Sequence, residues 1–185
     1  MRVITGKARG VVLKTPDGMS TRPTTDRVKE ALFSIIQFDI PGAKILDLFG
    51  GTGQLGIEAL SRGASGCVFV DKNIEAVQVI KRNLQHTGLM EKAQVLGTDA
   101  VSYLTRPGDR FDLVFLDPPY ASDLLEQVLY KVEPLVNDGG IIICETNETT
   151  KLPMRLGRFY LAKTARFGQA YIRIYRYSNE EEDVE

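Results

Sequence analysis

Blocks of apolar and polar residues alternate along the chain in a pattern that predicts strands and helices in turn. Short apolar runs, typical of buried strands, fall at residues 44–49, 67–71, 93–99, 110–117 and 139–146. Segments with apolar residues at helical spacing predict intervening helices over 55–63, 73–88, 100–106 and 122–136. Continuous apolar strands separated by helices indicate an α/β fold, with a mostly parallel sheet covered on both faces.

Both ends of the chain depart from this alternation. Residues 2–14 predict a short strand pair, and residues 24–38, which follow Pro23, predict a helix. Residues 158–177 read as two strands joined near Gly168, which is typical of an antiparallel hairpin. We therefore expect an N-terminal extension over residues 1–41, a core domain over 42–177 and a disordered acidic tail over 178–185.

The charge of the chain is unevenly distributed. The net charge of −1 over 185 residues combines +4 in residues 1–38, −7 in 39–150, +7 in 151–177 and −5 in the tail. If the two basic segments fold onto one face, they form a cationic patch suited to phosphates. The alternative is that these basic side chains are simply solvated.

Composition excludes several classes of protein. No apolar run approaches the roughly 20 residues that span a bilayer, and the N-terminus has no apolar segment typical of a signal peptide. Cys67 and Cys144 lie in apolar runs, which favours reduced core cysteines, and one histidine without a close cysteine pair predicts no metal site. We expect a cytoplasmic protein that does not bind membranes.

A glycine-rich loop follows the first core strand. In DLFGGTGQLG (47–56), Gly51, Gly53 and Gly56 spell G-x-G-x-x-G, which by itself is also compatible with a dinucleotide site. Asp47 precedes the glycines, where a carboxylate would lie badly near a pyrophosphate but could accept from an ammonium group. This favours S-adenosylmethionine over NAD as the cofactor.

Acidic residues end four successive strands, at Asp47, Asp71, Asp99 and Asp117. Ligands of open α/β sheets bind outside the carboxyl ends of the strands. Asp71 is placed for the ribose hydroxyls of the cofactor and Asp99 for the exocyclic amine of its adenine. Asp99 could instead be a helix N-cap.

The fourth strand ends in D-P-P-Y, residues 117–120. Asp117 and the Pro118 carbonyl can accept the two hydrogens of a nucleobase amine, which makes its nitrogen more nucleophilic, and Tyr120 offers a face for stacking the base. The sulfonium leaves as a neutral thioether, so no strong base is required. The sequence also contains no serine or cysteine triad. The alternative is an ordinary exit from the strand.

D-P-P-Y in this setting resembles the [DN]-P-P-[YF] motif of amino-group methyltransferases. Together with RPTTDRVKEALF (22–33) and LDLFGGTGQLGIEALSRGA (46–64), it makes residues 2–177 similar to the bacterial 16S ribosomal RNA guanine-N2 methyltransferases, a class I S-adenosylmethionine-dependent family. The resemblance implies a Rossmann-like, seven-stranded sheet whose C-terminal hairpin strand is antiparallel. It implies methylation of one guanine of 16S ribosomal RNA and favours an assembling small subunit as the substrate. We expect the protein to act as a monomer.

The resemblance also implies roles for particular residues. The catalytic motif falls on Asp117, Pro118, Pro119 and Tyr120. Cofactor contacts fall on Asp47, Phe49, Gly50, Gly51, Gly53, Asp71, Lys72, Asp99, Ala100, Thr24 and Thr25. Substrate contacts are expected from Arg2, Lys7, Arg9, Arg22 and Arg27.

Some positions depart from the family pattern, and two other functions stay open. The loop more usually reads F-A-G-S-G, Gln54 replaces a small residue, and Val11 and Val12 stand where basic residues are common. The alternatives are another nucleobase amino-methyltransferase, such as an adenine-N6 enzyme, and a non-catalytic RNA-binding assembly factor with the same fold.

Overall fold

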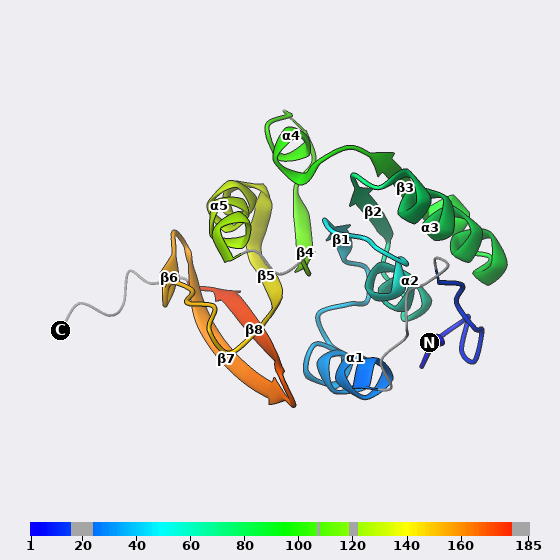
Figure 1. Cartoon of the computed structure of the whole chain (residues 1–185), viewed down its shortest axis with the longest axis horizontal. Helices are drawn as coiled ribbons and strands as arrows, with labels where there is room; N and C mark the ends of the chain where they lie inside the picture. The colour runs from blue at the N-terminus through cyan, green and yellow to red at the C-terminus, as the bar shows by residue number, and fades with distance from the viewer. Residues whose placement is uncertain (16–23, 107, 119–121, 179–185) are drawn as a thin grey trace.

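The computed structural model describes residues 1–15, 24–106, 108–118 and 122–178. Its centre is one mixed sheet of eight strands in the order β3-β2-β1-β4-β5-β8-β7-β6 (Figure 1). Neighbouring strands from β3 to β5 run parallel, whereas β8, β7 and β6 pair in antiparallel fashion. From β1 the chain continues to β2 and β3 on one side of the sheet and then to β4 and β5 on the other side. The direction of strand order therefore reverses between β1 and β4, which is the switch point where α/β sheets bind ligands.

The strands are β1 (Lys44–Asp47), β2 (Gly66–Asp71), β3 (Ala93–Gly97), β4 (Phe111–Leu116), β5 (Val136–Thr146), β6 (Arg155–Leu156), β7 (Phe159–Phe167) and β8 (Ala170–Tyr177). The helices are α1 (Thr24–Ile35), α2 (Gln54–Ser61), α3 (Ile74–Thr87), α4 (Ala100–Leu104) and α5 (Ser122–Val132). Two 3₁₀ turns, η1 (Met90–Lys92) and η2 (Glu133–Leu135), precede β3 and β5.

Two apolar cores lie on opposite faces of the sheet. Side chains of α1, α2, α3 and the N-terminal residues pack on one face, and those of α4 and α5 pack on the other. The predicted α/β class, with helices on both faces, is therefore confirmed. Cys67 and Cys144 are free thiols buried in these cores, as expected.

Several predicted boundaries needed correction. The sheet has eight strands rather than seven, because the two-residue β6 adds an edge strand beside β7. The predicted strand pair over residues 2–14 is only an isolated bridge between Arg2 and Val12. The helix predicted over 122–136 ends at Val132, and β5 begins at Val136 instead of 139. Pro134 lies in η2, between these two elements, where it lacks an N–H for a longer helix.

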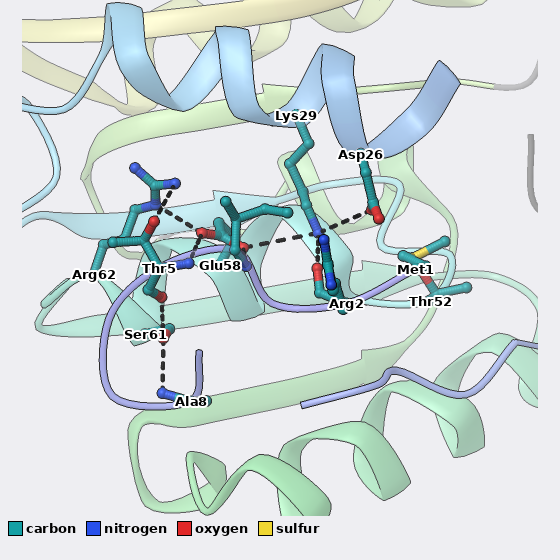
Figure 2. Close-up of polar contacts among 11 residues, drawn as sticks. Met1, Arg2, Thr5, Ala8, Asp26, Lys29, Thr52, Glu58, Ser61 and Arg62 are labelled. Atoms are coloured by element: carbon teal, nitrogen blue, oxygen red, sulfur yellow. Dashed lines mark hydrogen bonds and ion pairs between the residues drawn. The ribbon is translucent and has the colours of Figure 1, made fainter. Parts of the chain in front are cut away.

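Residues 1–14, here called the N-terminal segment, are held on the core by side chains of α2 (Figure 2). Both oxygens of the Glu58 carboxylate accept backbone N–H groups, from Ile4 at 2.7 Å and Thr5 at 3.0 Å. Ser61 Oγ accepts from the Ala8 N–H at 3.0 Å and donates to the Thr5 carbonyl at 2.6 Å. The segment is thus anchored through its backbone.

A buried cation completes the Glu58 cluster. Lys29 of α1 is 2% exposed, and its Nζ lies 3.8 Å from Glu58 Oε2 and donates to the Arg2 carbonyl at 2.5 Å. Arg62 donates from Nε to Glu58 Oε1 at 2.7 Å. Burial lowers the pKa of Lys29, and the nearby Glu58 carboxylate opposes this effect. One carboxylate therefore ties α1, α2 and the N-terminal segment together.

Glu58→Ala is expected to lower the free energy of unfolding by about 3–5 kcal/mol, since it leaves the Lys29 charge buried without its main partner. Asp109→Ala is the matched control, because it breaks the exposed ion pair with Lys44 and should cost only about 0–1 kcal/mol. Urea unfolding of both variants measures the difference. Equal losses would mean that the buried cluster contributes no more than a surface pair.

Candidate functional site

The topology brings the four predicted acids to the same edge of the sheet. Strands β3, β2, β1 and β4 are adjacent and parallel, and Asp47 and Asp71 are the last residues of β1 and β2. Asp117 directly follows β4, and Asp99 comes two residues after β3. Their carboxyl groups therefore line the carboxyl edge at the switch point, as the sequence predicted.

The glycine-rich loop between β1 and α2 depends on glycine at three positions. Gly51 and Gly53 have φ angles of 54° and 78°, which strongly favour glycine. A Cβ on Gly56 would lie 2.3 Å from the ring of Phe69, so only glycine lets α2 pack this closely on β2. The loop is thus a tight turn that leads directly into a helix N-terminus.

Asp47 has a structural role that the sequence did not reveal. The residue is 3% exposed, and its Oδ2 accepts the Gly56 N–H of α2 at 3.0 Å. Burial raises the pKa of this carboxyl group to about 7; the Gly56 hydrogen bond opposes the rise, and the negative charge of Asp71 adds to it. Asp47 therefore fixes the start of α2 as well as adding negative charge to the site.

Asp71 also holds the loop. Its Oδ2 accepts the Gly51 N–H at 2.9 Å, and its Oδ1 accepts the Asn73 N–H at 2.8 Å. Asn73 in turn caps α3 by accepting from Glu75 N–H at 2.8 Å. Each carboxylate oxygen can accept more than one hydrogen bond, so Asp71 retains capacity for a ligand hydroxyl.

Asp99 is the N-cap of α4. Its Oδ1 accepts the Ser102 N–H at 2.9 Å, and hydrogen bonding to Ser102 lowers the pKa of the exposed carboxyl group. The open alternative for Asp99 is thus realised in the structure. Ala100 begins the helix and is buried, whereas Asp99 stays accessible at the edge of the sheet.

Asp117 lies among other acids. Although the residue is partly open to solvent, atoms packed around its carboxyl group desolvate it, and Glu145 and Asp47 repel its charge. These effects raise the pKa of Asp117 to about 8. Pro118 is half-buried beside it, and Pro119 and Tyr120 lie outside the described residues. Glu145, at the end of the neighbouring β5, is a site residue that the sequence analysis missed.

Gln54 was noted only as a departure from the family pattern, but the structure places it at the site. It follows Gly53 and begins α2, and its Oε1 is buried with no hydrogen-bond partner in the described structure. An unsatisfied buried carbonyl is costly. Gln54 therefore supplies a ready acceptor at the glycine-rich loop for a ligand N–H.

The other predicted residues fall into three groups. Phe49 packs partly buried beside the loop, and Lys72 is exposed after β2. Thr24 and Thr25 begin α1, and Arg22 lies outside the described residues. The side chains of Arg2, Lys7, Arg9 and Arg27 are exposed.

The bases of residues 1–38 and 151–177 are spread over several elements. Figure 1 shows α1, which belongs to the first of these segments, between the N-terminal segment and the hairpin of β7 and β8. Some of their bases are also already engaged. Lys29 is buried, Arg158 pairs with Glu133 and Asp138, and Arg176 donates to both oxygens of Asp39 at 3.0 and 2.9 Å. The exposed bases are therefore fewer than the sequence charge suggested.

Comparisons with known proteins identify the family. The model of the family described as Conserved hypothetical protein 95 matches residues 1–176. Ribosomal RNA small subunit methyltransferase D of Escherichia coli (strain K12) is 35% identical over 178 residues, which cover 95% of this chain and 89% of that protein. The chain belongs to the ribosomal RNA small subunit methyltransferase D family.

Solved structures agree with this family assignment. The structure of yhhF from Escherichia coli superposes with a TM-score of 0.87 at 35% identity, covering 97% of this chain and 99% of that one. The 16S rRNA N2 G1207 methyltransferase RsmC of Thermus thermophilus, in complex with AdoMet and guanosine, has a TM-score of 0.72 at 21% identity, covering 88% of this chain and 45% of that one. The RsmC likeness shows the shared class I methyltransferase fold.

Residues 1–15, 24–106, 108–118 and 122–178 contain no cluster of histidine, cysteine or acidic side chains that could hold a metal ion. No helix within these ranges is long and apolar enough to cross a membrane.

Asp47→Asn should flatten the dependence of stability on pH. With a folded-state pKa of about 7, the wild-type native state binds more protons than the unfolded state between roughly pH 4 and 7. As the pH rises through this window, the free energy of unfolding of the wild type should fall, relative to that of the variant, by about 1.4 kcal/mol for each pH unit. Asparagine keeps an acceptor for Gly56 but does not titrate. Urea unfolding of both proteins at pH 5, 6 and 7 measures this difference in stability. A difference that does not change with pH would show that Asp47 is ionised throughout.

Proposed function

We propose that the protein transfers a methyl group from S-adenosylmethionine to the exocyclic N2 amine of a guanine in 16S ribosomal RNA. The observation that carries the proposal is the row of acids at the carboxyl edge, beside an intact glycine-rich loop, in a member of this family. The relative from Escherichia coli is named for methylation of small-subunit ribosomal RNA. The N2 position rests on the D-P-P-Y motif and the family resemblance.

The residues at the edge fit a cationic cofactor. Asp47, Asp71 and Asp117 crowd carboxyl groups at this edge, and burial together with repulsion between acids raises the pKa values of Asp47 and Asp117. A ligand with an ammonium and a sulfonium would favour their ionised forms, whereas a pyrophosphate would add to the repulsion. Gln54 Oε1 offers an acceptor to the ammonium. We assign Asp71 to the ribose hydroxyls, since its oxygens can each accept a further hydrogen bond.

Other contacts complete the proposed cofactor site. Gly51 and Gly53 give the loop its tight turn, and we assign Gly50, Gly51 and Gly53 to backbone contacts with the cofactor and Asp99 and Ala100 to its adenine. Phe49 and Lys72 flank the loop and the end of β2. Thr24 and Thr25, at the start of α1, are assigned to the methionine end.

The chain contributes positioning and electrostatics to the reaction. When bound, the cofactor supplies a methyl group on a positively charged sulfur. Asp117 and the Pro118 carbonyl accept the two N2 hydrogens of guanine, and Tyr120 stacks on the base. The N2 lone pair would form the new bond to the methyl carbon while the sulfur–carbon bond breaks and leaves its electrons on sulfur, and the proton that N2 loses would pass to solvent water. Pro119 restrains the backbone that aims the Pro118 carbonyl.

Substrate binding is assigned to three exposed basic regions. Arg2, Lys7 and Arg9 lie on the N-terminal segment and Arg27 on α1, with Arg22 in the connection between them. Lys163 and Arg166 add exposed positive charge on the hairpin. This distribution suits a long, phosphate-rich surface such as an assembling small ribosomal subunit. We propose that the protein acts there as a monomer in the cytoplasm.

The direct test is mass spectrometry of 16S ribosomal RNA from a strain that lacks the gene. One N2-methylguanine should be absent, and expression of the wild-type protein should restore it. A missing methyladenine, or an unchanged RNA, would contradict the proposed substrate.

Asp117 should act as an acceptor rather than a strong base. Asp117→Asn keeps a carbonyl oxygen and should retain measurable turnover, whereas Asp117→Ala should lose about 10²–10³ in rate. Because the raised pKa is about 8, kcat/KM of the wild type should rise with pH toward about 8, and this limb should be missing from Asp117→Asn.

Single-turnover methyl transfer measures these Asp117 rates, with cofactor binding as the check on folding. Equal and complete loss in both variants would indicate proton abstraction by a true base. Full activity of Asp117→Ala would remove the residue from the mechanism. A wild-type protein that binds its RNA but transfers no methyl group would favour an assembly factor.

Neutralising Arg2, Lys7 and Arg9 together should weaken RNA binding and reduce the slope of log K against log salt by about 2–3. Cofactor affinity without RNA should be unchanged, because Glu58 and Ser61 hold this segment through its backbone. Lys44→Gln, at the opposite edge of the sheet, is the control. Filter binding over a salt series gives both slopes. An unaltered slope in the triple variant would place the RNA surface elsewhere.

A further inference from the structure

The two ends of the N-terminal segment meet at the glycine-rich loop. The Leu13 N–H donates to the Met1 carbonyl at 3.1 Å, which brings the first residue beside the end of the segment. Thr52 of the loop donates from Oγ1 to Met1 Sδ at 3.4 Å (Figure 2). The segment that carries Arg2, Lys7 and Arg9 therefore contacts the loop that is assigned to the cofactor.

The side-chain amide of Asn83 forms hydrogen bonds to both the N-terminal segment and the glycine-rich loop. Asn83 of α3 is 0% exposed. Its Oδ1 accepts the Lys14 N–H at 2.7 Å, and its Nδ2 donates to the Lys14 carbonyl at 3.0 Å and to the Thr52 carbonyl at 2.9 Å. All three bonds go to backbone atoms, so Asn83 fixes the end of the N-terminal segment and the glycine-rich loop relative to each other.

The two other side chains that anchor the segment, Glu58 and Ser61, differ from Asn83 in their hydrogen-bond partners. Glu58 and Ser61 also bond its backbone, at Ile4, Thr5 and Ala8. In the described part of the chain, the side-chain hydrogen bonds of Glu58 and Ser61 go to this segment and to Arg62, and none of them reaches residues 50–53. Asn83 is thus the anchor that also holds Thr52.

We propose that Asn83 is a positioning residue that couples binding of RNA on the N-terminal segment to binding of the cofactor at the glycine-rich loop. This inference rests on the proposed function, since it takes the basic side chains of the segment as contacts for phosphates. RNA bound to Arg2, Lys7 and Arg9 restrains the segment, and Asn83, which holds the backbone of Lys14, transmits this restraint to the Thr52 carbonyl.

The expected sign of the coupling is positive. A loop that is already restrained loses less conformational entropy when the cofactor binds, so affinity rises. The coupling is reciprocal, because the cofactor must increase RNA affinity by the same factor. Coupling between sites typically changes affinity about 5–150-fold, and we expect about 10-fold here.

The wild-type protein gives the first test. Equilibrium dialysis with radiolabelled S-adenosylhomocysteine, which cannot donate a methyl group, measures its Kd without and with saturating small ribosomal subunits from a deletion strain. We expect the subunits to tighten binding about 10-fold. Subunits that bind but leave the Kd unchanged would overturn the coupling alone. Subunits that do not bind would contradict the proposed function itself.

A matched pair of variants tests Asn83. Asn83→Ala and Ser61→Ala each remove a buried side chain that anchors the N-terminal segment through hydrogen bonds to its backbone. Both should weaken RNA binding to a similar degree. Only Asn83→Ala should bring the ratio of the two Kd values close to one, whereas Ser61→Ala should keep the wild-type ratio.

A second substitution covers the case in which Asn83→Ala does not fold. Asn83→Asp keeps the acceptor for Lys14 N–H but cannot donate to the Thr52 carbonyl, so it should also lose the coupling. A wild-type ratio in a folded Asn83 variant would overturn the proposal. Loss of the ratio in Ser61→Ala as well would do the same, since any weakening of the segment would then suffice.

Discussion

The positions of α1, α2 and the N-terminal segment depend on the ion pair and hydrogen bonds of the buried Glu58 carboxylate. Lys29 neutralises its charge, and two backbone N–H groups and Arg62 satisfy its oxygens (Figure 2). A buried carboxylate is stable only when it is paired and hydrogen-bonded in this way. Because its partners come from α1, α2 and the N-terminal segment, these elements cover the sheet as one unit beside the glycine-rich loop.

The site depends on that unit and on the topology of the sheet. Parallel strands on both sides of β1 bring Asp47, Asp71 and Asp117 to one edge. Asp47 and Asp71 then hold the turn and helix from which the loop is built. The same carboxyl groups therefore hold the loop in place and would bind the positive charge of the proposed cofactor. A substitution at either position would change both the stability of the loop and the affinity for a cationic ligand.

The sequence predicted features that are local in the chain. The glycines of the loop, the acids at strand ends and the hairpin turn at Gly168 are all read from neighbouring residues, and the structure places them as expected. The Lys29–Glu58 cluster and the bonds of Asn83 join residues far apart in sequence, and Glu58 looked like any charged residue of a helix. β6 was missed because two residues are too few to show a strand pattern.

The way in which the N-terminal segment is anchored has a consequence for how this family can diversify. Its hydrogen bonds to Glu58, Ser61 and Asn83 use main-chain atoms of Ile4, Thr5, Ala8 and Lys14. Most of its exposed side chains can therefore be exchanged without loss of the anchors. Val12, whose side chain is exposed, has this freedom, whereas Val11 is partly buried against the core. Evolution can alter which RNA surface is recognised while the catalytic machinery stays constant.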